Sequence, residues 1–206
     1  MENRQDVPAR RSGPAQPTSA ARATSTAQPS TTALTAAAAR AAHLIVDDEP
    51  RIFADPLAAR LLGDRADELL SYHTLHGTHP ILAGARTQVA CRSRYTQDAL
   101  DRAAAAGVTQ YAILGAGLDS FAYRGGLAGR LRVFEVDHPA SQEAKRAALA
   151  AARIPAPDNV AFVPADLATD SLSGCLAGAG FDATAPRSSA GWASRCTWRR
   201  TRSPRR

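Results

Sequence analysis

The chain has 206 residues, of which 45% are hydrophobic, and this is enough for one domain with a buried core. The net charge is +6, but residues 187–206 hold seven arginines and no acidic residue. The basic character therefore belongs to that segment, which excludes a domain-wide basic surface for nucleic acid. The three cysteines, Cys91, Cys175 and Cys196, show neither metal-ligand spacing nor an even number, so we expect no metal site and no disulfide framework.

The N-terminal segment predicts a leader. Residues 1–33 are rich in Ala, Ser, Thr, Pro and Arg and contain almost no large apolar side chains, so we expect them to be disordered. No apolar run in the sequence is long enough for a signal peptide or a membrane span, and we therefore expect a cytoplasmic protein. A helical pattern begins at Thr35 and stops at Pro50.

Two more helices are predicted before residue 107. The stretch "DPLAARLLGD" offers Asp55 as the N-cap and Pro56 at the first helical position, and Gly63 ends it. The next helix runs over about residues 82–106 and closes at Gly107, a favourable C-cap residue. Residues 34–106 are therefore expected to be helical.

Three histidines lie between these two helices. They are His73, His76 and His79, spaced three apart, which raises the question of a metal site. Gly77 and Pro80 favour a loop there, and no carboxylate is interleaved. We therefore expect a polar loop without a metal.

The remaining part, residues 107–186, changes to an α/β pattern. Three apolar runs, "QYAILGAG", "LRVFEVDHP" and "VAFVPADL", end in glycines or acids, and the helix-favouring stretch 140–153 separates the last two. Apolar runs without strict alternation are typical of parallel strands that are covered on both faces. The sequence therefore predicts an α/β fold with a doubly wound parallel sheet.

The first run leads into a glycine-containing turn, "ILGAGLDS". Gly115 and Gly117 allow a sharp turn and the close approach of a ligand, as any nucleotide-type cofactor requires. A dinucleotide site favours a third glycine, where this chain has Ser120, and the adjacent Asp119 would repel a pyrophosphate. A carboxylate suits a ligand with an ammonium group and no phosphate, such as S-adenosyl-L-methionine.

Acidic residues also end the second and third runs. Asp137, twenty residues after Gly117, can accept hydrogen bonds from both ribose hydroxyls. Glu135 shares its face of the strand, but Asp137 is nearer the carboxyl end. Asp166 ends the third run, where it can receive an adenine amino group, with Leu167 packing near the base.

Several segments resemble one known family. "QYAILGAGLDSFAYR", "VFEVDHPASQEAKRAAL" and "VPADL" are similar to actinobacterial S-adenosyl-L-methionine-dependent methyltransferases related to leucine carboxyl methyltransferases. "TALTAAAARAAH", "FADPLAARLLG" and "RSRYTQDALDRAAAAGV" fit the helical part of that family, so the resemblance covers about residues 31–186. It implies a class I methyltransferase, Rossmann-like sheet, with residues 34–106 as an N-terminal helical lid and residues 107–186 as the first half of the cofactor domain.

The resemblance also implies cofactor-binding residues in the glycine-containing loop, in the helix before it and at the ends of the next two strands: Arg92, Gly115, Ala116, Gly117, Asp119, Asp137, Asp166 and Leu167. It places Asp119 near the methionine amino group. In the family an arginine before the first strand pairs with the cofactor carboxylate, which suits the bidentate guanidinium fork. Arg92 occupies that position, although Arg94 lies only two residues away. No general base is identified, so the catalytic residues stay unassigned.

The resemblance implies methyl transfer from S-adenosyl-L-methionine to a carboxylate or hydroxyl oxygen of a small molecule. A different reading is a nucleic-acid-binding protein in which the arginine-rich tail binds phosphates and Trp192 and Trp198 stack on bases. A third is an NAD(P)-binding oxidoreductase, which Asp119 and Ser120 disfavour. We expect a small-molecule acceptor as the partner, and neither nucleic acid nor a membrane.

The last twenty residues depart from the family. Its members continue after "GFDATAP" with a fourth strand similar to "FSWLGVTMYL", whereas this chain continues from Arg187 with a basic sequence. A shifted frame of one possible coding sequence for residues 189–202 reads "SWLGVTMYLEEDA". We therefore hypothesise a frame change after Pro186, with residues 187–206 out of frame. Without a fourth strand, the strand in "QYAILGAG" would be an unpaired edge, and activity would be weak or lost.

Overall fold

A computed structural model describes the chain over residues 29–191, with side chains up to Ser189. Four helices precede the sheet: α1 (Thr31–Val46), α2 (Ala58–Leu61), α3 (Ala66–Leu75) and α4 (Pro80–Ala105). The strands are β1 (Gln110–Leu114), β2 (Arg132–Asp137), β3 (Val160–Pro164) and β4 (Arg187–Gly191). Helix α5 (Pro139–Ala151) follows β2 and α6 (Leu172–Gly178) follows β3, while the short 3₁₀ helices are η1 (Gly63–Arg65), η2 (Phe121–Tyr123) and η3 (Gly126–Arg130).

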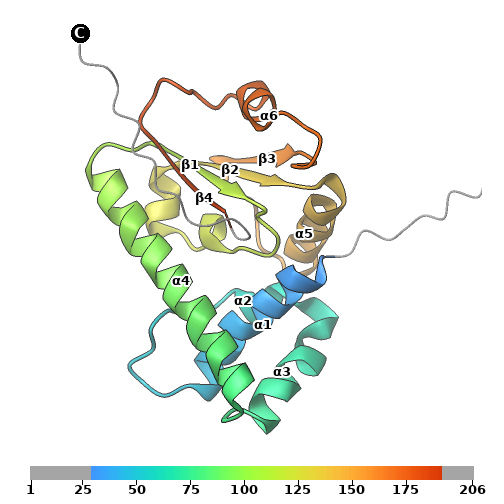
Figure 1. The fold of residues 1–206 in the computed structure, drawn as a ribbon. Helices are drawn as coiled ribbons and strands as arrows, with labels where there is room; N and C mark the ends of the chain where they lie inside the picture. The colour runs from blue at the N-terminus through green and yellow to red at the C-terminus, as the bar shows by residue number, and fades with distance from the viewer. Residues whose placement is uncertain (1–28, 192–206) are drawn as a thin grey trace, which may run out of the picture.

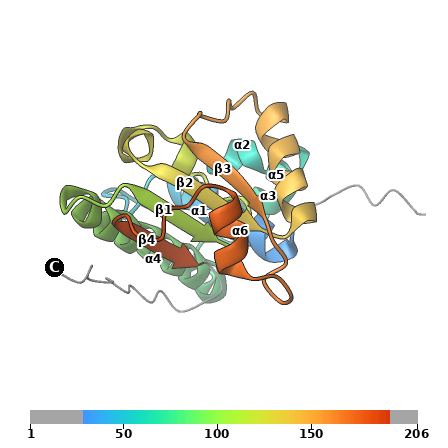
Figure 2. The ribbon, with the colours of Figure 1, turned by 90° about the horizontal axis from the view of Figure 1, so that it is seen from above.

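The sheet has the order β3-β2-β1-β4, and all its pairings are parallel. The predicted α/β fold is confirmed, because this order is that of the first four strands of a doubly wound sheet. Helix α6 covers one face, whereas α4 and α5 lie toward the other (Figures 1 and 2). Helices α1, α2 and α3 pack beyond the carboxyl ends of the strands and form, with α4, the predicted helical region (Figure 1).

Alternate residues of the strands build the core on the two faces of the sheet. On one face Tyr111 and Ile113 of β1 pack with Leu100 of α4. On the other face Phe134 and Val136 of β2 pack with Leu176 of α6. Because both faces are covered, the strands are apolar on both sides, which explains the continuous apolar runs of the sequence.

Helix α1 begins earlier than the sequence analysis predicted. Its N-cap is Ser30, whose Oγ accepts a hydrogen bond from the backbone nitrogen of Ala33 at 3.1 Å. The predicted leader over residues 1–33 is therefore wrong for its last three residues, because a serine cap starts the helix at Thr31. Residues 1–28 of the predicted leader lie outside the described part of the chain.

The expected polar loop around the three histidines is confirmed for residues 76–79, whereas residues 73–75 belong to the last turn of a helix. His73 belongs to α3 and is buried, while His76 is the C-cap of that helix and His79 the N-cap of α4. The His73 ring lies 3.5 Å from a guanidinium nitrogen of Arg86, which also holds Asp47 at 2.7 Å. The period-three spacing therefore reflects one packed residue and two capping residues.

The fourth strand corrects a prediction about β1. Residues Arg187–Gly191 form β4 and pair in parallel with β1, so the strand in "QYAILGAG" is not an unpaired edge. The sequence of β4 is nevertheless polar. Ser188 is buried, and its hydroxyl finds no hydrogen-bond partner among the described residues. The remainder of the predicted basic tail, residues 192–206, lies outside those residues, and with it Trp192, Trp198 and Cys196.

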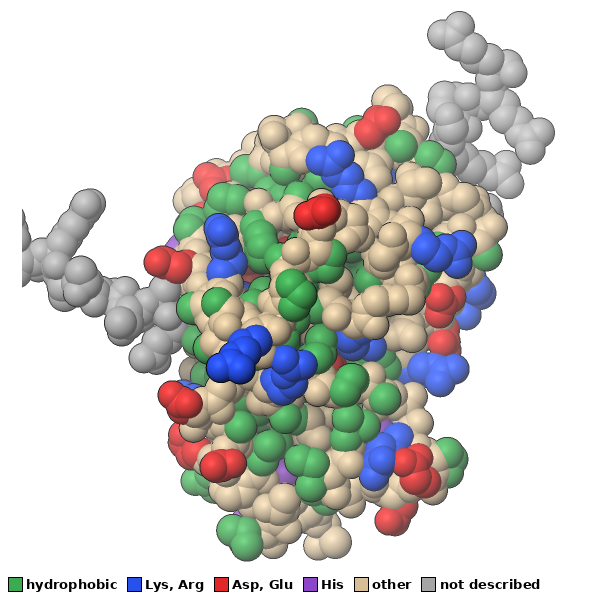
Figure 3. All heavy atoms as spheres, turned by 180° about the vertical axis from the view of Figure 1, so that it is seen from behind, with side chains coloured by type: hydrophobic (Ala, Val, Ile, Leu, Met, Phe, Trp, Pro, Cys, Tyr) green, Lys and Arg blue, Asp and Glu red, His purple; other side chains and the backbone are tan. Residues whose placement is uncertain are grey.

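The surface is mixed in charge. On the face seen in Figure 3, lysine and arginine side chains of the described residues are interspersed with acidic and apolar ones. No helix between residues 29 and 191 has both the length and the hydropathy that are needed to cross a bilayer.

Candidate cofactor-binding site

The loop after β1 is shaped by two glycines. Gly115 and Gly117 have φ angles of +65° and +47°, which side-chain-bearing residues rarely adopt. A Cβ atom on Gly117 would lie 3.0 Å from the Cβ atom of Ala33 in the first turn of α1. The helical region therefore rests directly on the glycine loop, and a side chain at residue 117 would push the two apart.

The loop is fixed to the end of the neighbouring strand. The backbone nitrogen of Gly117 donates a hydrogen bond of 2.6 Å to Oδ2 of Asp137, at the end of β2. The Oδ1 atom of Asp137 accepts a second bond of 2.7 Å from the backbone nitrogen of His138. Each carboxylate oxygen has a further lone pair, so Asp137 can still accept hydrogen bonds from a ligand.

A cavity of about 240 Å³ lies between this loop and the first half of α1. Its walls combine backbone from the glycine loop, two carboxylates and polar groups of α1, and they are formed by Ser30, Thr32, Ala33, Ala36, Arg40, Gly115, Ala116, Gly117, Leu118, Asp119 and Asp137. Five of the eight predicted cofactor-binding residues are among them. These five residues, which lie on two strand ends, therefore surround one cavity.

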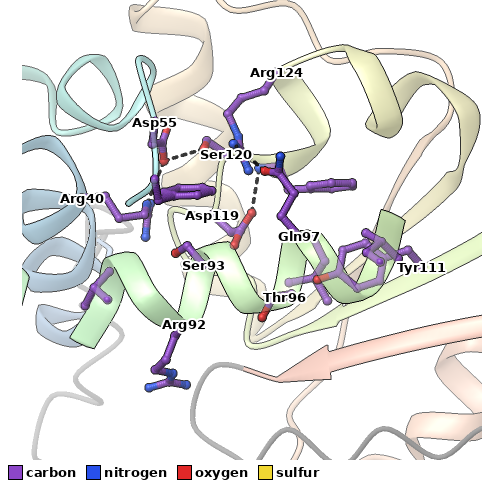
Figure 4. A pocket seen from close by; sticks show the side chains of 15 residues that line it. Arg40, Asp55, Arg92, Ser93, Thr96, Gln97, Tyr111, Asp119, Ser120 and Arg124 are labelled. Atoms are coloured by element: carbon purple, nitrogen blue, oxygen red, sulfur yellow. Dashed lines mark hydrogen bonds and ion pairs between the residues drawn. The ribbon is translucent and has the colours of Figure 1, made fainter. Parts of the chain in front are cut away.

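A second, smaller cavity of about 60 Å³ lies between α4 and the sheet, and Arg40 and Asp119 line both cavities. Arg92 of α4 also lines the smaller one. Its guanidinium, however, extends on the opposite side of α4 from Asp119 (Figure 4). The structure thus places Arg92 at the site without directing its charge toward Asp119.

The last two predicted residues lie apart from both cavities. The Oδ1 atom of Asp166 accepts a hydrogen bond of 3.0 Å from the backbone nitrogen of Ala168, and this stabilises the turn after β3. Leu167 is 49% exposed. Their assignment to the adenine remains a prediction, and both lie in the segment that follows β3.

A buried ion pair beside the glycine loop was not predicted from the sequence. The Nε atom of Arg40 lies 2.8 Å from Oδ2 of Asp55, and the two side chains are only 4% and 1% exposed. The predicted role of Asp55 as the N-cap is wrong, because α2 begins at Ala58 with Leu57 as its N-cap. The Oδ1 atom of Asp55 accepts the backbone nitrogen of Leu57 at 3.2 Å, in the turn that leads into the helix. An acidic residue before a proline signalled this turn, but nothing local signalled that Arg40, fifteen residues earlier, is its partner.

A second buried ion pair lies behind Asp137, on the same strand. The Nζ atom of Lys145 in α5 lies 2.7 Å from Oε2 of Glu135, which also accepts the Tyr123 hydroxyl at 3.1 Å. Burial raises the pKa of Glu135, and Lys145 opposes that shift. Burial, together with the Glu135 charge, also raises the pKa of Tyr123, so the hydroxyl keeps its proton. This cluster is packed inside the domain and lines neither of the two cavities.

Comparison with known proteins identifies the family. The model of the leucine carboxyl methyltransferase family matches residues 33–193. The chain belongs to this family.

Individual relatives agree with this family assignment. A protein of Mycolicibacterium smegmatis, named as an S-adenosyl-L-methionine-dependent methyltransferase, is 36% identical over 159 residues, which cover 74% of this chain and 52% of the relative. A Mycobacterium tuberculosis protein named in the same way is 34% identical over 163 residues, with the same two coverages. YktD of Bacillus subtilis, also so named, is 45% identical over 76 residues, which cover 36% of this chain and 25% of YktD. The chain thus spans about half the length of the two mycobacterial relatives.

Proposed function

We propose that this chain binds S-adenosyl-L-methionine and that the protein transfers its methyl group to a carboxylate or hydroxyl oxygen of a small molecule. The observation that carries the proposal is the pair of carboxylates, Asp119 and Asp137, on either side of a glycine loop at one cavity. The names of the relatives support the same cofactor. A cytoplasmic location and a small-molecule acceptor remain predictions.

The residues around the larger cavity fit this cofactor chemically. Its ammonium requires an acceptor or an anion, and Asp119 supplies a half-buried carboxylate. Its ribose hydroxyls are donors, and Asp137 has acceptor capacity beyond the two backbone bonds that it already receives. The glycines leave space for close contact with the backbone. Among the described residues that line the larger cavity, Arg40 is the one basic side chain, and Asp55 compensates its charge. From these residues a pyrophosphate would meet two carboxylates and no uncompensated cation.

The bound cofactor would supply an electrophilic methyl group on a good leaving group. The task left to the protein is to orient the cofactor and to exclude water. Asp119 would hold the ammonium and Asp137 the ribose hydroxyls, the glycine loop would set the depth of binding, and the first turn of α1 would cover the ligand. These residues account for binding and orientation.

Isothermal calorimetry on the full chain tests the proposal, with S-adenosylhomocysteine as the ligand and NADH as the competitor. We expect saturable binding of S-adenosylhomocysteine to one site and no displacement by NADH. An Asp119→Asn variant should lose affinity, because it removes the charge that faces the ammonium. NADH binding that S-adenosylhomocysteine cannot displace would instead favour an oxidoreductase and overturn the proposal.

A further inference from the structure

The side chains of Arg40 and Asp55 make further hydrogen bonds besides the ion pair between them. Taking two charges out of water is costly unless the remaining donors and acceptors are also satisfied. Here a terminal guanidinium nitrogen of Arg40 donates to the carbonyl oxygen of Leu118 at 2.7 Å. The Ser120 hydroxyl donates to Oδ2 of Asp55 at 2.6 Å. The pair therefore uses its spare hydrogen-bonding capacity on the segment that follows the glycine loop.

These two bonds lie on either side of a single residue. Leu118 and Ser120 are the sequence neighbours of Asp119, so one ion pair holds the backbone before Asp119 and the side chain after it. Asp119 itself accepts a hydrogen bond of 2.7 Å from the backbone nitrogen of Phe121. The Asp119 carboxylate is thus held directly by one bond, and the residues on either side of it are held by the ion pair. Figure 4 shows Arg40, Asp55, Ser120 and Asp119 gathered on one side of α4.

The charges of these residues indicate which of them is available to a ligand. Arg40 and Asp119 line the same two cavities, and an uncompensated arginine there would weaken the attraction of Asp119 for a cation. Asp55, 1% exposed, neutralises Arg40 from the side of the loop before α2. Asp119 thereby remains the negative group that is available to a ligand at this position.

We infer that Arg40 and Asp55 are positioning residues, which set the Asp119 carboxylate for the ammonium group of the amino-acid part of the ligand. This inference rests on the proposed binding of S-adenosyl-L-methionine. It assigns to the helical region a part in recognising the amino-acid end of the cofactor, in addition to covering the cavity. Through this ion pair, the position of α1 affects the position of the Asp119 carboxylate, which lies outside α1.

The test compares two ligands that differ only at that end. S-adenosylhomocysteine carries the ammonium and carboxylate, whereas 5′-methylthioadenosine has the same nucleoside and thioether without them. The variant Arg40→Lys keeps the charge that balances Asp55 but cannot reach both Asp55 and the Leu118 carbonyl as the guanidinium fork does. The variant Ser120→Ala removes only the second bond. Circular dichroism and thermal melting first establish that both variants fold.

We expect Arg40→Lys to weaken S-adenosylhomocysteine binding about tenfold, as the loss of one charge-assisted hydrogen bond would do. Ser120→Ala should weaken it only about threefold, because the ion pair itself stays in place. Binding of 5′-methylthioadenosine should change less than about twofold in both. The matched control Ser173→Ala, which changes an exposed hydroxyl of α6 that lines neither cavity, should leave both affinities unchanged.

Equal weakening of the two ligands would show that the pair only supports the fold, and no weakening of either would show that it does not position Asp119. Either result overturns the inference while leaving the proposed function intact. If the unmodified chain binds neither ligand, the proposed function fails and the positioning role fails with it.

Discussion

The Oδ2 atom of Asp137 lies 2.6 Å from the backbone nitrogen of Gly117, and this bond joins the end of β2 to the loop after β1. The carboxylate thus serves the protein and remains open to a ligand at the same cavity. Replacing Asp137 by asparagine separates these two roles, because the amide keeps an acceptor for the backbone nitrogen of Gly117 but loses the negative charge.

We predict that Asp137→Asn lowers the affinity for S-adenosylhomocysteine about tenfold, because bonds to a charged acceptor contribute about 1.5–3 kcal/mol. The thermal midpoint should fall only modestly, since the amide oxygen still accepts the Gly117 bond, whereas the amide nitrogen cannot accept the bond from the backbone nitrogen of His138. Calorimetry and thermal melting measure the two effects. The exposed Asp158→Asn, in the loop before β3, is the control and should change neither. A large fall in stability with unchanged affinity would contradict the prediction.

The buried pair of Glu135 and Lys145 leads us to expect that a single substitution destabilises the protein and that a second substitution restores most of the stability. Lys145→Met leaves the Glu135 carboxylate buried without a cation and should lower the free energy of unfolding by about 3 kcal/mol. Adding Glu135→Gln removes the charge and keeps an acceptor for the Tyr123 hydroxyl, so most of the loss should be recovered. Urea unfolding measures both.

The same pair predicts a pH dependence. Burial already raises the folded-state pKa of Glu135 above 4.5, and loss of Lys145 removes the charge that opposes this. A raised folded-state pKa favours the protein below the unfolded-state value and disfavours it as pH rises through the folded-state value. The deficit of Lys145→Met should therefore shrink toward acid pH, and a deficit that grows there would refute this account.

His73 predicts a second, opposite pH effect. Burial and the nearby Arg86 lower its pKa from 6.5, so the folded protein binds its proton less readily than the unfolded chain. Stability is then present above pH 6.5 and is lost as pH falls below it. His73→Gln should flatten this part of the slope in thermal midpoints measured between about pH 7.5 and 5.5. His76→Gln, at an exposed position, should leave the slope as it is.

We expect that a substitution of Ser188 on β4 stabilises the protein. Its buried hydroxyl has no partner among the described residues. Ser188 borders a hollow of about 220 Å³ whose other lining residues are Leu114, Leu172, Leu176, Phe181, Arg187 and the exposed Ser189. Ser188→Val removes the unsatisfied group and suits a strand, so we expect a gain of about 1 kcal/mol in urea unfolding. The exposed neighbour, Ser189→Val, should have no comparable effect. A lower urea midpoint for Ser188→Val would count against this reading of β4.

The nucleotide sequence tests the origin of β4. A buried unsatisfied serine in a strand that pairs with β1 agrees with the hypothesis of a frame change after Pro186. The gene should then encode "SWLGVTMYLEEDA", or a close relative of it, in a shifted frame over the codons of residues 189–202. The hypothesis fails if no frame downstream of Pro186 encodes an apolar strand.

Much of the fold was predictable because its signals are local. The ends of several elements are marked by local residues, through backbone conformation or capping. These are the glycines after β1, the acids at the ends of β2 and β3, and Gly107 after α4. Helix α3 was missed because Gly77 and Pro80, which lie just after it, were taken to describe the stretch before them. β4 was judged from the family pattern and not from its capacity to pair through backbone groups, which depends little on side chains.

The site was predictable in its glycines and carboxylates but not in its supporting contacts. Asp119 and Asp137 lie beside loop and strand signals that the sequence displays. The bond from Arg40 to the Leu118 carbonyl spans 78 residues, and that between Ser120 and Asp55 spans 65. Such partners depend on how the helices dock on the sheet, and no periodicity or cap encodes that docking.

The contact of Ala33 with Gly117 has a kinetic consequence. The first turn of α1 forms one wall of the larger cavity, together with Ser30, its N-cap. The end of a helix opens at much lower free energy than its packed middle. We therefore expect a ligand to leave by fraying of that one turn, without rotation of α1 as a whole. Its residence time should then depend on the Ser30 cap as well as on the contacts on the sheet side.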